Sequence, residues 1–301
     1  MQVDKQNGKI CFNEDTHTYF NVDDVNDRYV SVTTLIHSFT QPFDKDFWSA
    51  YKALEKLLPK ESWNIEKKSL LNTKKFDKSI LEVYNISEND FNREQQQILD
   101  NWDEENRKAC DRGTKIHLDI ENSFYKNPNA GQLKKFGIGG KFECKKDYYD
   151  LDLENGVYPE YLIFRESPDN VLKIAGQVDL IIKSGNEIIL IDHKTNKKID
   201  QKSGYNTVTK STAKMKYPLN TLDDCNYNHY QLQLSTYAWM LQKINPNFII
   251  KDLILNHYDH NGNNTLYHCN YLKQEVERML AYYKKQLIIE KQKSKRKRIE
   301  Y

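Results

Sequence analysis

The sequence predicts an α/β fold in which a central mixed sheet is flanked by helices. Strand-like segments rich in aliphatic residues occur at 157–166, 171–184 and 187–195. Helical spacing of apolar residues dominates 43–125 and returns at 228–244. A chain of 301 residues is also long enough to bury a large core. Strands and helices that share one chain in this way are typical of an α/β domain.

The ends of the chain are predicted to be attached to this core. Residues 9–20 and 28–36 alternate in polarity around a polar turn, which indicates a β-hairpin. We expect residues 1–90 to form a hairpin and helical elaboration that packs on a core of residues 91–290. Residues 291–301 form a basic C-terminal tail, which either meets phosphate or is a solvated terminus.

The composition excludes several classes of protein. Hydrophobic residues make up 38% of the chain and charged residues 29%, and no stretch reaches the roughly 18 apolar residues of a spanning helix. The N-terminal segment lacks the apolar run of a signal peptide, so we expect no membrane contact and a cytoplasmic location, in a host cytoplasm if a phage encodes the chain. The five cysteines are scattered without a CxxC pair, which favours reduced thiols.

The strand predicted at 187–195 ends in charged side chains. Alternation places Asp192 and Lys194 on one face and His193 on the other. A Gly-Asn turn after residue 184 predicts a hairpin that sets this strand beside the one carrying Asp179. The two carboxylates then meet at one edge of the sheet, where they repel each other unless a cation lies between them.

Carboxylate ligands of this kind suit Mg²⁺ or Mn²⁺, and Lys194 lies within reach of an anionic transition state. The pattern therefore indicates phosphodiester hydrolysis. Gly176 fits such a site, because a glycine inside a strand often marks the close approach of another group. The competing interpretation is a solvated acid–lysine pair, worth less than about 1 kcal/mol. The order GQVD, apolar strand, DHKT favours the site.

GQVD followed by IDHKT resembles the PD-(D/E)XK nuclease superfamily, with Asp192 as the middle acid of a D-x-K variant. RGTKIHLDIE and YQLQLSTYAWML are similar to the upstream histidine helix and the Q-x-x-x-Y helix of its RecB-like, phage-type exonuclease branch. The match runs from about Trp102 to Leu241. It implies a restriction-endonuclease-like core.

The resemblance also implies a set of site residues. The catalytic residues it implies are Asp179, Asp192, Lys194, Gln233 and Tyr237. The metal ligands it implies are His117, Asp179, Asp192 and the backbone carbonyl of His193, with Glu121 and Glu160 as further candidates.

Each of these residues also has a structural interpretation. His117 and Glu121 share a helix face, but a lone helical histidine is more often structural, and Glu121 either binds a second metal or pairs with a nearby lysine. Gln233 and Tyr237 lie one turn apart on what is also an ordinary core face. Glu160 is either near the metals or an edge-strand charge.

Other cofactors are not expected. Iron–sulfur relatives hold the cluster with three cysteines after the Q-x-x-x-Y helix, and only Cys269 follows it here. There is no Walker motif, so ATP is not implied. The polar segment 196–230 is rich in Lys and Tyr, which suits either a single-strand or end-binding groove or a solvated loop.

These observations predict a divalent-metal-dependent DNA nuclease, an exonuclease acting on DNA ends in phage-type recombination or replication. A structure-specific or restriction-like endonuclease, and a non-catalytic DNA-binding recombination partner on the same scaffold, remain alternatives. The expected partners are DNA and a recombination or single-strand annealing protein. A homo-oligomer would suit a processive enzyme, although no residue pattern identifies an interface.

Overall fold

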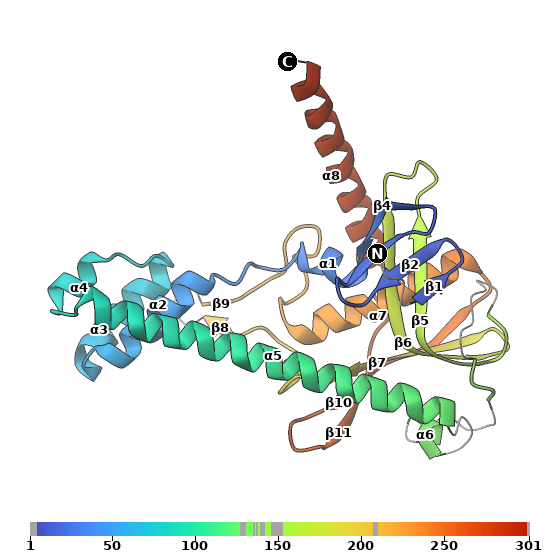
Figure 1. Ribbon diagram of the computed structural model, residues 1–301, viewed down its shortest axis with the longest axis horizontal. Helices are drawn as coiled ribbons and strands as arrows, with labels where there is room; N and C mark the ends of the chain where they lie inside the picture. Colours follow the sequence, from blue (N-terminus) through green and yellow to red (C-terminus); the bar gives the residue numbers. More distant parts are fainter. Residues whose placement is uncertain are drawn as a thin grey trace. The chain divides into compact units, whose positions relative to one another are not determined.

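The computed structural model in Figure 1 describes residues 5–126, 131–134, 136, 138, 142–145, 153–206 and 210–299. The chain divides into two compact units. The first comprises Met1–Thr40, Gly113–Lys202 and Lys214–Tyr301, and the second comprises Gln41–Arg112 and Ser203–Ala213. Most of the segment predicted as irregular, 127–155, lies outside the described residues.

The first unit is built on a mixed sheet with helices against it, which confirms the predicted α/β fold. In the described residues the sheet has nine strands in the order β1-β2-β3-β4-β6-β7-β10-β11, and β5 pairs with β6. The pairs β4–β6 and β7–β10 are parallel and the other pairs are antiparallel. The strands are β1 (Lys5–Asn7), β2 (Ile10–Asn13), β3 (Thr18–Asn21), β4 (Asp24–Ser31), β5 (Gly156–Glu166), β6 (Lys173–Ser184), β7 (Glu187–Lys194), β10 (Ile249–Tyr258) and β11 (Asn264–His268).

Among the residues that the structure describes, four helices lie within this unit, and the end of a fifth belongs to it. They are α1 (Val32–His37), α6 (Gly131–Lys134), α7 (Asn226–Ile244), α8 (Lys273–Ile299) and the last part of α5 (Glu88–Lys126). Helix α8 continues through most of the stretch predicted as a basic tail, 291–301, and ends at Ile299. The basic segment is therefore helical over its described part.

The predicted hairpin between residues 171 and 195 is confirmed as β6 and β7. Gly185 adopts φ +58°, a left-handed conformation that a glycine reaches without the steric cost of a Cβ atom. The ladder then runs from Ser184↔Glu187 to Leu180↔Ile191. Because the turn fixes the register, it also fixes which side chains lie opposite each other at the far end of the hairpin.

Both faces of β7 are buried, which explains its uninterrupted aliphatic sequence. Ile188 and Leu190 pack in the core cluster that includes α7, whereas Ile191 packs with Phe124 of α5. Alternation along the strand therefore separates two hydrophobic layers. The same alternation directs Asp192, two residues beyond Leu190, toward the α7 side.

The predicted pairing of residues 9–20 with 28–36 is confirmed in part, because β3 pairs antiparallel with β4 and sets Tyr19 opposite Tyr29, but the segment is not a single hairpin. Residues 9–20 fold as a hairpin by themselves, with β2 and β3 joined by a turn in which Thr16 N donates to Asn13 Oδ1 at 2.8 Å. The residues after Ser31 are helical rather than extended. Ser31 Oγ accepts from Thr34 N at 3.0 Å and caps α1, and this cap outweighs the strand preference of the β-branched Val32 and Thr33.

The second unit has a hydrophobic core of its own, in the region predicted to be helical. Its elements are α2 (Lys45–Leu57), α3 (Lys60–Thr73), α4 (Ser79–Val83), the first part of α5 and the short strands β8 (Tyr205–Asn206) and β9 (Ser211–Thr212). Phe47, Leu54, Trp63 and Phe91 are buried together in it. The sequence grouped the N-terminal strands with these helices in 1–90, but β4 pairs with β6, and this pairing assigns the strands to the first unit.

Candidate metal centre

Three carboxylates lie at one level across β5, β6 and β7. The β5–β6 ladder pairs Pro159 with Leu180 and then Tyr161 with Val178, so Glu160 falls opposite Asp179. The β6–β7 ladder ends at Leu180↔Ile191, and its next position sets Asp179 opposite Asp192. Glu160 itself has φ +50°, which interrupts the ladder locally. Figure 1 shows β5, β6 and β7 as neighbouring strands, and the register of these strands brings the acids together.

The row of acids occurs where the sheet divides. Strand β5 pairs with β6 from Lys173 to Lys183, apart from the interruption at Glu160. The opposite edge of β6 is shared, because β4 pairs with Ile174 and Ala175 while β7 pairs from Leu180 onward. Residues 176–179 lie between these two partners. Side chains from α5 and α7 approach β6 at this interval.

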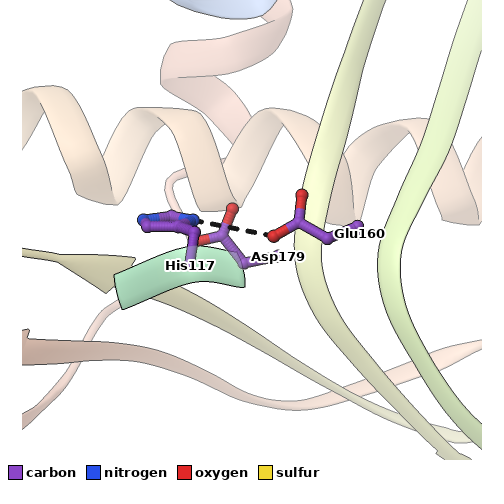
Figure 2. A group of neighbouring side chains, drawn as sticks. All are labelled: His117, Glu160 and Asp179. Carbon is purple, nitrogen blue, oxygen red and sulfur yellow. Dashed lines mark ion pairs between the residues drawn. The ribbon is translucent and has the colours of Figure 1, made fainter. Parts of the chain in front are cut away.

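His117 on α5 completes a cluster with two of the acids. Its Nδ1 atom lies 3.6 Å from both Glu160 Oε1 and Asp179 Oδ2, and Figure 2 shows the three side chains directed toward one another. One ligand atom from each residue lies within 4.8 Å of the others. Magnesium binds oxygen at about 2.0–2.1 Å in an octahedron, which places adjacent ligands roughly 3 Å apart. The cluster therefore approaches the dimensions of a small-cation site.

The backbone of His193 belongs to the same group. Its N–H donates to Asp179 Oδ2 at 2.6 Å, and its carbonyl oxygen lies 3.0 Å from His117 Nε2. The imidazole and the two carboxylates form a donor set of the kind that divalent cations such as Mg²⁺ and Mn²⁺ accept, and the carbonyl lies beside this set, at the other ring nitrogen of His117. The residues present thus fit a divalent cation.

The electrostatics of the cluster depend on burial. Burial raises the pKa of Asp179, and the neighbouring Glu160 raises it further. For His117, burial lowers the pKa, but the negative charges of Asp179 and Glu160 outweigh this effect and raise it to about 9. The imidazole therefore carries a proton at neutral pH when no cation is bound. A divalent cation would replace that proton as the positive charge between the acids.

Asp192 and Lys194 form a second group beside the first. Lys194 Nζ lies 2.7 Å from Asp192 Oδ2, and Gln233 Nε2 donates to Asp192 Oδ1 at 3.1 Å. Burial raises the pKa of Asp192 to about 6, although Lys194 opposes this shift. Asp192 is 1% exposed, and its carboxylate is engaged by α7 and by its own strand rather than by the His117 cluster.

Gln233 and Tyr237 of α7 combine core packing with contacts that lead to Asp192. Tyr237 is buried in the main core cluster, as a core face requires. Gln233 Nε2 nevertheless also lies 3.4 Å from the Tyr237 hydroxyl, so the pair connects to Asp192. A Cβ atom at Gly176 would lie 2.5 Å from Tyr237 Cε1, so the glycine makes the close approach of the ring possible.

A cavity of about 580 Å³ opens onto the cluster. The β2–β3 hairpin forms part of its wall with Phe12, Glu14 and His17, and residues of β4, α1, α5, β5, β6 and α7 form the remainder. Glu121 lines the cavity and accepts from the Tyr125 hydroxyl at 3.1 Å, but it does not belong to the three-residue cluster.

Two residues near the site were missed by the sequence analysis. Gln177 Nε2 donates to Glu160 Oε2 from the next strand. Its signal was present in GQVD, because alternation places Gln177 and Asp179 on the same face. Tyr230 of α7 lies with its ring centroid 4.7 Å from Lys194 Nζ. From the sequence it was covered only as part of the Lys- and Tyr-rich segment 196–230, and neither composition nor helix spacing indicates a contact with β7.

No family model and no curated protein matches the chain. Two solved structures are similar in part. One, SSO0001, has 20% sequence identity and a TM-score of 0.32, and the match covers 58% of this chain and 58% of that protein's length. The other is a candidate exonuclease from Eubacterium rectale, with 11% identity and a TM-score of 0.33 over 86% of this chain and 80% of that one. Similarities this low carry no argument about the site.

The helices of the described residues include none that is both long and apolar enough to cross a membrane.

Proposed function

We propose that the chain is a divalent-metal-dependent DNA nuclease that hydrolyses phosphodiester bonds. The observation that carries the proposal is the convergence of His117, Glu160 and Asp179 at the interval where β4 and β7 separate along β6, with Asp192 and Lys194 beside them. Acids, an imidazole and a partly buried lysine gathered at one point are the components of a metal-assisted hydrolytic site.

His117, Asp179, Glu160 and the carbonyl of His193 would hold Mg²⁺ or Mn²⁺, with Asp192 adjoining them. When bound, the cation supplies charge neutralisation for the phosphate and lowers the pKa of water. Gln233 fixes the orientation of the Asp192 carboxylate by its hydrogen bond. Lys194 Nζ, held by Asp192, is placed to donate a hydrogen bond to an attacking water or to a phosphate oxygen.

The finer proposal is an exonuclease that acts on DNA ends in phage-type recombination or replication. It is supported by the order of the four sequence motifs, which are similar to those of the phage-type exonuclease branch. DNA and a recombination or single-strand annealing protein are the proposed partners.

The test compares end-labelled linear duplex with nicked and closed circular DNA, with Mg²⁺ and with EDTA. We expect Mg²⁺-dependent loss of label from linear DNA and no attack on closed circles. Cleavage of closed circles would show that the enzyme is an endonuclease rather than an exonuclease, because closed circles have no ends. DNA binding without cleavage under every metal condition would leave a non-catalytic binding protein and overturn the nuclease.

Two variants test whether DNA cleavage depends on Asp192. Asp192→Ala should reduce cleavage by about 100-fold or more while DNA binding persists, because it removes a carboxylate from the reacting centre. Asp169→Asn is the matched control, since Asp169 is an exposed acid in the β5–β6 turn that pairs with Lys284. Wild-type cleavage by Asp192→Ala would contradict the assignment.

A further inference from the structure

The ammonium group of Lys194 has two neighbours from different elements. Asp192 Oδ2 lies 2.7 Å from it on the same strand, and the ring centroid of Tyr230 lies 4.7 Å from it on α7. The lysine side chain is only 18% exposed, so little water competes for its charge. A cation over an aromatic face is attracted by the ring quadrupole, and the attraction grows as water is removed.

Tyr230 and Gln233 lie three positions apart and therefore share a face of α7. Gln233 donates to Asp192 Oδ1, while the Tyr230 ring faces Lys194. Tyr230 also packs against the main core cluster, which restricts the motion of its ring. One helix face thus restrains both charged side chains at the end of β7.

We propose that Tyr230 is a positioning residue that keeps the Lys194 ammonium directed into the reacting centre. The inference rests on the proposed nuclease function. An Asp192 carboxylate that is drawn toward a bound cation becomes a weaker partner for Lys194, because the two positive charges compete for it. The ring contact with Tyr230 does not depend on Asp192. The Tyr230 ring therefore still restrains the Lys194 ammonium when a bound cation attracts the Asp192 carboxylate.

The experiment compares Tyr230→Phe and Tyr230→Leu in kcat, KM and Mn²⁺ affinity. Because the ring makes the contact, Phe should keep kcat within about 2-fold of wild type, whereas Leu should lower kcat by about 5- to 30-fold. KM and Mn²⁺ affinity should stay unchanged in both variants. Equal losses in Phe and Leu, or a loss confined to KM or to metal affinity, would overturn the role.

A double-mutant cycle with Lys194→Met separates positioning from general destabilisation. In the Met background, which lacks the ammonium, Tyr230→Leu should cause no further loss of kcat. The same cycle measured on the folding equilibrium constant should show a coupling of about 2- to 30-fold. Independent, additive effects in the folding cycle would overturn the contact, whether or not the Met variant retains measurable cleavage.

Tyr227→Leu is the matched control. Tyr227 lies on the same helix, but its ring packs beside Tyr267 rather than over Lys194, so its coupling to Lys194→Met should be absent. The two proposals fail separately. A wild-type protein that cleaves no DNA would contradict the proposed nuclease function. Additive effects on folding in the Tyr230–Lys194 cycle would contradict the proposed positioning contact.

Discussion

The two groups of charged residues at the candidate site balance their charges differently. In one, Lys194 lies 2.7 Å from Asp192 and neutralises it from two residues away on the same strand. In the other, Glu160 and Asp179 both pair with His117, whose positive charge is a removable proton. Acids on one level of a sheet can therefore differ in the source of the positive charge that balances them. In the Asp192 group the balancing charge is the ammonium of Lys194. In the Glu160–Asp179 group it is a proton on His117, which a metal ion can replace.

The largest expected effect is on Mn²⁺ affinity, which should depend more on Asp179 than on Asp192. Asp179→Asn should weaken Mn²⁺ binding by about 100-fold or more, because it removes a proposed ligand. Asp192→Asn should weaken it less, by about 10-fold, because Asp192 already has Lys194. Isothermal titration calorimetry measures both. Equal losses of Mn²⁺ affinity would mean that the two groups form one metal centre, which would contradict the difference between them.

Gly176 leaves room for the ring of Tyr237, which contacts Gln233 of the Asp192 group. Gly176→Ala should lower stability by roughly 1–3 kcal/mol, because the new methyl group overlaps the Tyr237 ring and must displace it. Thermal unfolding measures the change.

Gly204→Ala is the matched control for this substitution, because a Cβ atom there meets nothing within 4 Å. A Gly176→Ala protein as stable as this control would show that the ring has room to move.

The proton on His117 makes the stability of the folded protein depend on pH. The pKa of His117 is raised to about 9 in the folded protein, above its ordinary value of 6.5. Its contribution to stability is therefore fully present below pH 6.5 and is lost as pH rises through 9. Without metal, wild type should exceed His117→Gln in stability by on the order of 2 kcal/mol at pH 6, and the difference should shrink toward pH 9.5.

Urea unfolding at a series of pH values, in the presence of EDTA, measures this difference. A gap between the two proteins that stays constant from pH 6 to 9.5 would show that His117 holds no proton between the acids.

Local sequence rules predicted part of the site from particular residues. Period-two alternation placed Asp192 and Lys194 on one face, and the turn at Gly185 placed their strand beside the one with Asp179. The same rules failed at Ser31, because a side-chain cap outweighed the strand preference of the residues after it. They were also silent about Tyr230, whose helix face looks like ordinary core.

The sequence by itself determined the elements that carry the site and the face on which each side chain lies, because periodicity and turn chemistry act over a few residues. Only the tertiary structure decided which atoms meet. Glu160 reached Asp179 through the register of β5 on β6, and His117 reached them from α5, more than 40 residues earlier in the chain. Such contacts depend on strand register and helix packing across the whole unit, which no short stretch of sequence specifies.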